Sequence, residues 1–161
     1  MKKAHRYNLG VIGNCHYMAY IDTQSSVSWM CWPSMDSSFV FGNLLDDVKG
    51  GNFQVLPLSR FHTEQRYVDN TAVLTTRFFC EDGSFEVIDF APRFKRTDRF
   101  FKPMQFFRKI KYLSGKPRIK IICEPRGHYG ETTPGNFTGS NHICFTGLHM
   151  PIRLTTNASK T

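Results

Sequence analysis

Short apolar segments alternate with polar turn segments along the chain, at the spacing typical of an all-β protein. The clearest case is a predicted hairpin, in which residues 72–80 and 84–91 flank the pair Asp82-Gly83. An Asp-Gly pair suits a turn that needs positive φ. Further strands are predicted at residues 7–13, 17–22, 27–32 and 52–58.

The hairpin strands have apolar residues on both faces, as expected for strands that are covered on both sides. Two more hairpins are predicted downstream. The first joins residues 104–113 to 117–125 through a turn at Gly115, and the second joins residues 142–147 to 150–156. We expect antiparallel pairing within each of them.

One segment follows a different pattern. Asp36 and two serines precede apolar residues at helical spacing, and a carboxylate in that position can cap backbone N–H groups. This predicts a short helix that ends at Gly50-Gly51 and buries Phe39, Val40, Phe41, Leu44 and Leu45. No long amphipathic helix separates the strands, so the fold class is all-β. We expect a β-sandwich of the super-sandwich type, with about ten antiparallel strands and one short helix.

Composition and charge narrow the possible functions. The chain has 161 residues, of which 40% are hydrophobic and 14% aromatic, enough for one domain with its own core. The net charge of +8 suggests an acidic partner, but basic residues are dispersed, with short runs only at Lys2-Lys3, 93–96 and 108–111. No segment is apolar enough for a membrane span or a signal peptide. Five separated cysteines without a CxxC motif favour reduced thiols in a cytoplasmic protein over disulfides or zinc.

The common catalytic signatures are absent. There is no GxSxG, P-loop, GxGxxG or HExxH motif, and the histidines lack metal-ligand spacing. The glutamates are scattered, with none marked as half of a glycosidase carboxylate pair. We therefore expect no catalytic residue, no metal and no cofactor in this chain.

Unusual side chains are concentrated in residues 12–16 and 28–37, where Trp29 and Trp32 lie within four residues of each other. Three interpretations remain open for this stretch: core packing, docking onto another domain, and direct contact with a sugar.

These segments carry a resemblance to a known family. IGNCHYMAYI (12–21), SSVSWMCWPSMDSS (25–38) and FGNLLD (41–46) are similar to the opening segments IGDCRTAALV, GSIDWLCLPRFDSP and FAALL of glycoside hydrolase family 15, the bacterial and archaeal glucoamylase- and trehalase-like enzymes. Residues 65–94 and 106–130 also resemble the family's sequence in the expected order.

The resemblance implies that residues 1–161 form a single N-terminal β-sandwich domain. In the family this domain is joined to a catalytic (α/α)6 barrel, which is absent from this chain. The barrel carries the two catalytic glutamates, so the chain alone is expected to be inactive. Its parent is expected to be a glucan 1,4-α-glucosidase or an α,α-trehalase, hydrolysing α-glucosidic bonds with inversion.

The expected role is to pack on and stabilise the barrel and to contribute a loop at the rim of its cleft. Where the family has Asp-Cys-Arg and Pro-Arg-Phe-Asp, this chain has Asn-Cys-His and Pro-Ser-Met-Asp, so docking or selectivity is expected to differ. The candidate docking or cleft-rim residues are Asn14, His16, Trp32, Ser34, Met35 and Asp36.

The expected partners are that barrel and, through it, trehalose or an α-glucan; neither a membrane nor a nucleic acid is expected. Two alternatives remain. One is a stand-alone carbohydrate-binding module that uses Trp32, Tyr112 or Tyr129. The other is a basic domain that binds nucleic acid.

Overall fold

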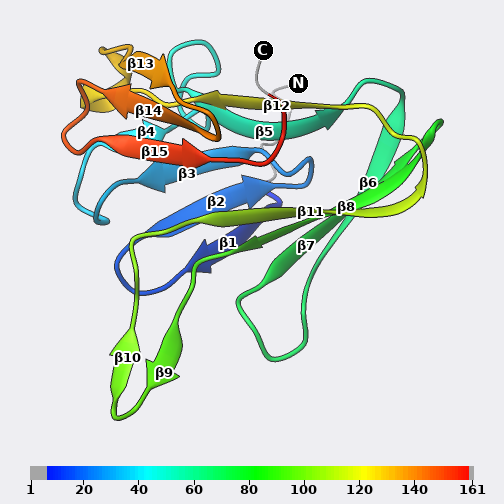
Figure 1. Cartoon of the computed structure of the whole chain (residues 1–161), viewed down its shortest axis with the longest axis horizontal. Helices are drawn as coiled ribbons and strands as arrows, with labels where there is room; N and C mark the ends of the chain where they lie inside the picture. Colours follow the sequence, from blue (N-terminus) through cyan, green and yellow to red (C-terminus); the bar gives the residue numbers. More distant parts are fainter. Residues whose placement is uncertain (1–6, 160–161) are drawn as a thin grey trace, which may run out of the picture.

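The computed structural model describes residues 7–159, and this part of the chain is almost entirely β (Figure 1). It contains fifteen strands and one single-turn 3-10 helix, η1 (His128–Gly130). Residues 1–6 and 160–161, which include Lys2-Lys3, lie outside the described residues. The predicted all-β fold is confirmed, with more and shorter strands than expected.

Two four-stranded antiparallel sheets form much of the structure. One has the order β1-β2-β3-β4, and the other the order β11-β8-β7-β6. Their strands are β1 (Leu9–Gly13), β2 (Met18–Asp22), β3 (Val27–Cys31), β4 (Phe39–Phe41), β6 (Phe61–Tyr67), β7 (Leu74–Cys80), β8 (Gly83–Phe90) and β11 (Phe107–Gly115). The predicted hairpin at 72–91 is confirmed as β7 and β8. Alternate residues of each strand form one buried face, but the other face of β8 is only partly buried and Arg77 on β7 is exposed, so the predicted cover on both faces is incomplete.

Three smaller antiparallel sheets complete the chain. They are a β12-β5 ribbon, a β13-β14-β15 sheet and a separate β10-β9 ribbon. Their strands are β5 (Asn52–Pro57), β9 (Phe94–Arg96), β10 (Arg99–Phe101), β12 (Ile119–Glu124), β13 (Gly135–Thr138), β14 (His142–Thr146) and β15 (Ile152–Thr155). The predicted hairpin near the end of the chain is confirmed as β14 and β15.

The β12-β5 ribbon lies between two core clusters and joins them. Phe53 belongs to the larger cluster with residues of β1–β4, whereas Val55 belongs to a smaller cluster with residues of β7 and β8. Ile121 of β12 packs against both clusters. The antiparallel sheets therefore stack as a sandwich whose two layers share apolar side chains across the ribbon.

A buried ion pair ties the layers together. The Arg108 guanidinium on β11 donates to both carboxylate oxygens of Asp89 on β8, at 2.8 and 3.0 Å, and their side chains are 4% and 0% exposed. Arg108 also donates to the carbonyl oxygen of Phe53 at 2.6 Å and to the carbonyl and hydroxyl oxygens of Ser25. One side chain thus links β8, β11, β5 and the β2–β3 turn.

The predicted short helix after Asp36 is wrong. Phe39–Phe41 form strand β4, which pairs with β3, and all three residues are buried. Turns follow, and the Asp46 carboxylate accepts the N–H groups of Val48 and Lys49 at 2.9 and 2.8 Å. Three consecutive apolar residues fit a fully buried strand as well as a helix, so the pattern alone could not separate them.

The predicted hairpin at 104–125 is also wrong. The chain does turn at Gly115, where φ is +71°, but β11 pairs with β8 while β12 pairs with β5. Asp82 holds this crossing: its carbonyl oxygen accepts the Lys116 N–H at 2.8 Å and its carboxylate accepts the Arg118 N–H at 3.2 Å. Ile110 and Ile119 then pack against the same cluster from different sheets.

Candidate functional site

The loop of residues 32–38 is a tight turn that leaves β3. It contains a cis Trp32-Pro33 bond. The Ser34 hydroxyl donates to the Asp36 carboxylate at 2.6 Å and lies 2.9 Å from the Ser37 hydroxyl. The Ser34 hydrogen bond lowers the pKa of Asp36 below its ordinary value. Asp36 therefore carries its charge on the surface and orders this loop, whereas its predicted role as a helix cap is wrong.

Two side chains of this loop differ in exposure. Trp32 is half-buried and packs edge-on against Tyr17, with ring centroids 4.9 Å apart, at the border of the larger core cluster. Met35 is 50% exposed. The loop thus combines a tryptophan anchored in the core with an apolar side chain that projects into solvent.

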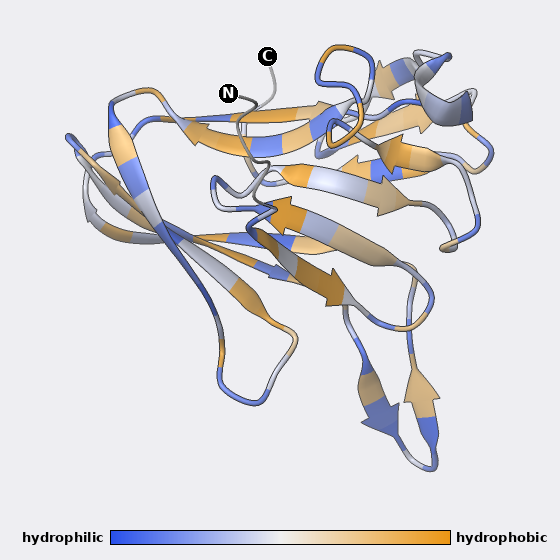
Figure 2. Ribbon diagram, turned by 180° about the vertical axis from the view of Figure 1, so that it is seen from behind, coloured by the Kyte–Doolittle hydropathy of each residue, from blue (hydrophilic) through white to orange (hydrophobic). Residues whose placement is uncertain are grey.

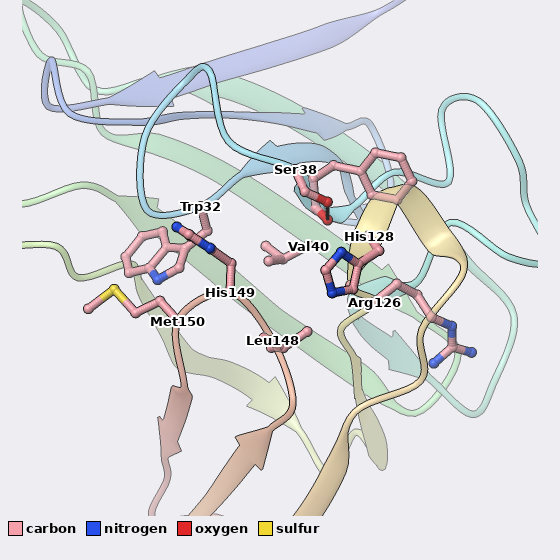
Figure 3. A pocket seen from close by; sticks show the side chains of 10 residues that line it. Trp32, Ser38, Val40, Arg126, His128, Leu148, His149 and Met150 are labelled. Carbon is pink, nitrogen blue, oxygen red and sulfur yellow. Dashed lines mark hydrogen bonds between the residues drawn. The ribbon is translucent and has the colours of Figure 1, made fainter.

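A shallow recess lies beside this loop (Figure 3). Its walls include Trp32, Val40, His128, Leu148, His149 and Met150. The cavity volume is about 20 Å³. Since a water molecule needs roughly 10–15 Å³ by this measure, the recess holds about one water and no sugar ring. Of the other aromatic residues considered for sugar binding, Tyr112 lies on β11 in a different sheet from Trp32. Tyr129 of η1 is 66% exposed and packs against Phe39, which lines the recess.

Asn14 and His16 lie at another place, the turn between β1 and β2. Asn14 is 1% exposed, and its amide nitrogen donates to the carbonyl oxygens of Pro92 and Pro103 at 3.2 and 2.9 Å. Its side-chain oxygen accepts the His16 N–H at 3.1 Å, and His16 itself is exposed. The buried Asn14 side chain therefore fastens the segments on both sides of the β9-β10 ribbon.

All five cysteines are free thiols within the described residues. Cys15 is exposed and the other four are wholly or partly buried. Burial raises the pKa of Cys31 and Cys80, and it raises that of Cys123 to about 12. These three thiols consequently stay protonated and unreactive at neutral pH.

Residues 7–159 contain no cluster of three or more His, Cys, Asp or Glu side chains that could hold a metal ion. They also contain no helix of the length and hydropathy that crossing a membrane would need.

Comparison with known proteins assigns the family. A family model described as "Trehalase-like, N-terminal" matches residues 3–159. The chain belongs to the trehalase-like N-terminal family. It is 26% identical to Trehalase 2 of Sulfolobus acidocaldarius over 156 residues, covering 87% of this chain and 25% of that protein. It is 29% identical to a trehalase of Thermoplasma volcanium over 129 residues, covering 78% of this chain and 20% of that protein.

A third relative matches a shorter part. Trehalase 1 of Sulfolobus acidocaldarius is 39% identical over 85 residues, covering 52% of this chain and 15% of that protein. This trehalase-like N-terminal domain thus spans a quarter or less of the length of these relatives. No solved structure gives a significant match.

Two features of the site region were not predicted. One feature of the sequence pointed to the Arg108–Asp89 pair. Asp89 follows Phe85 and Val87 at alternate positions of β8, so it lies on the same buried face. The projecting β9-β10 ribbon had another signal, the concentration of four basic residues and three phenylalanines in residues 93–101.

Proposed function

We propose that this chain is the noncatalytic N-terminal domain of a longer α-glucosidic hydrolase of the glycoside hydrolase family 15 type. Residues 1–161 would form one domain that packs on an (α/α)6 catalytic barrel supplied by the same polypeptide. The observation that carries the proposal is the match to trehalases over only 15–25% of their length. Trehalose is the first substrate to test because the relatives are named trehalases, and α-glucans are the second.

The loop of residues 32–38 is the proposed docking or cleft-rim element. Its internal hydrogen bonds hold it in shape, and Met35 presents an apolar contact next to the charged Asp36. A preordered loop loses little conformational entropy on docking, so each contact contributes more to binding. His16 is a further exposed candidate, whereas Asn14 acts through the segments that it holds.

The first test is binding in trans. The 161-residue chain and the remainder of its polypeptide would be purified separately and titrated by calorimetry. We expect a saturable complex, and we expect Met35→Ser to weaken it by about tenfold, as for a central apolar contact.

The control is Leu58→Ser, because Leu58 is 60% exposed but lies in the turn after β5. If Leu58→Ser weakens binding as much as Met35→Ser does, the loop of residues 32–38 is not part of the interface. The absence of any complex would refute the docking role.

We also propose a cytoplasmic location, which fractionation of the native cells would test.

A further inference from the structure

The β9-β10 ribbon projects away from the sandwich as a two-stranded arm (Figures 1 and 2). We call residues 92–103 the arm. All six strand residues are exposed, and the phenylalanines are exposed to an unusual degree: 50% for Phe94, 59% for Phe100 and 42% for Phe101. An isolated two-stranded ribbon is marginally stable in water, and large exposed apolar side chains commonly mark an interaction surface.

The strand register places aromatic and basic side chains on both faces of the arm. Directly opposed residues share a face, and Phe101 opposes Phe94 with their rings stacked at 5.8 Å. Phe100 opposes Lys95 on the other face. A surface that mixes aromatic and cationic groups in this way fits a partner that offers apolar contacts together with negative charge.

The charges of the arm are unbalanced. Residues 92–103 contain five basic residues and one acidic residue. Arg99 lies directly opposite Arg96, and like charges in that position destabilise a ribbon. Within residues 7–159, Arg108–Asp89 is the one ion pair, so no basic residue of the arm forms an ion pair with a carboxylate there. Carboxylates of a partner would relieve this repulsion.

The base of the arm is held firmly. Asn14 donates to the carbonyl oxygens of both Pro92, which precedes β9, and Pro103, which follows β10. Next to them, the Tyr17 hydroxyl donates to the carbonyl oxygen of Gln105 at 2.5 Å. The sandwich therefore presents the arm in a defined direction, and this preorganisation lowers the entropic cost of binding.

We propose that the arm binds an acidic, partly apolar surface on the catalytic portion of the same polypeptide. The inference rests on the proposed function and adds a second contact to it, separate from the loop of residues 32–38. The relatives contain three or more times as much chain outside the matched part as within it, which is ample to supply such a surface.

The charges and ring contacts favour this occupant over others. A second copy of the chain would bring two positively charged arms together, and they would repel each other. A single-stranded nucleic acid would need open ring faces for stacking. Phe94 and Phe101 stack on one another and the Arg93 guanidinium lies 5.3 Å from the centre of the Phe100 ring, so one face of each ring is already taken.

The test compares side-chain labelling in the longer protein with labelling in the 161-residue chain. Hydroxyl-radical oxidation, read by mass spectrometry, reports the exposure of Phe94, Phe100, Phe101 and Met35 separately. We expect the labelling of the arm phenylalanines to be lost in the longer protein, while that of Phe137, 56% exposed on β13, stays unchanged as a control.

The outcomes separate the two proposals. If the arm is labelled equally in both proteins while Met35 is protected in the longer one, the arm inference is overturned and the docking role of residues 32–38 is supported. Protection of the arm without Met35 would support the arm and remove the loop from the interface. A native product of only 161 residues would refute both proposals.

Binding in trans between the two separated parts of the longer protein gives a second measurement, with the substitutions made in the 161-residue part. Phe100→Ser and Arg99→Glu should each weaken binding in trans by about tenfold or more, whereas Phe137→Ser should not. Added salt should weaken the wild-type complex more than the Arg99→Glu complex. Arm-dependent binding of a labelled oligothymidylate by the chain, without binding to the catalytic portion, would overturn the proposal in favour of nucleic acid.

Discussion

Removing the Arg108 guanidinium should strongly destabilise this domain. Arg108→Met keeps an unbranched side chain of similar length but leaves the Asp89 carboxylate, 0% exposed, with the Ser25 hydroxyl at 3.5 Å as its remaining side-chain partner. The carbonyl oxygen of Phe53 loses a donor as well. Breaking a buried pair from one side costs about 3–5 kcal/mol. At about 2–4 °C per kcal/mol for a chain of this size, Tm should fall by roughly 6–20 °C.

The assay is urea denaturation followed by tryptophan fluorescence, with Tm measured by calorimetry. The control is Arg66→Met, because Arg66 is exposed on β6 of the same sheet, and we expect it to change stability by less than about 0.5 kcal/mol. The double variant Asp89→Val with Arg108→Met removes both charges. It should be less destabilised than the sum of the single variants by about 1–3 kcal/mol. A loss below about 1 kcal/mol in Arg108→Met, or strictly additive single variants, would refute this reasoning.

Three further predictions concern side chains at or near the candidate docking surfaces. Burial raises the pKa of Tyr17, so the folded chain retains this proton above pH 10 while the unfolded chain loses it, and stability should fall as pH rises through this range. Tyr17→Phe should remove that part of the alkaline decline in urea titrations, and an unchanged slope would contradict the assignment. Ser34→Ala should raise the pKa of Asp36 toward its ordinary value in an NMR titration, because the hydroxyl donor is lost; an unmoved pKa would mean that the loop is held differently. Asn14→Asp should cost about 2–4 kcal/mol and speed amide hydrogen exchange in the arm, since both donors to its two ends are lost; unaltered exchange would show that other contacts fix the arm.

The strands were predictable because the period-two alternation is local. Phe85, Val87 and Asp89 occupy alternate positions and so share one face of β8, and the structure buries all three. The short segment Phe39–Phe41 was not predictable as a strand, because a run of three apolar residues carries no period. Its pairing with β3, which decides the matter, is a tertiary contact.

The partner of a strand was harder to predict than its existence. The turn at Gly115 was expected, but whether β11 and β12 pair with each other depends on Asp82, which is distant in sequence and binds the turn. Asn14 was predicted only as a docking contact for the same reason. Its acceptors, Pro92 and Pro103, are more than seventy residues away and gave no local signal.

The most direct test of the account is a comparison of hydrolysis by the separated parts. Glucose release from trehalose and from maltotriose would be measured for the 161-residue chain, for the remainder of its polypeptide, and for the two mixed. The account predicts no release by the chain alone and a longer activity half-life of the remainder once the chain is added. Glucose release by the pure chain would contradict the account. So would an activity half-life of the remainder that does not change when the chain is added.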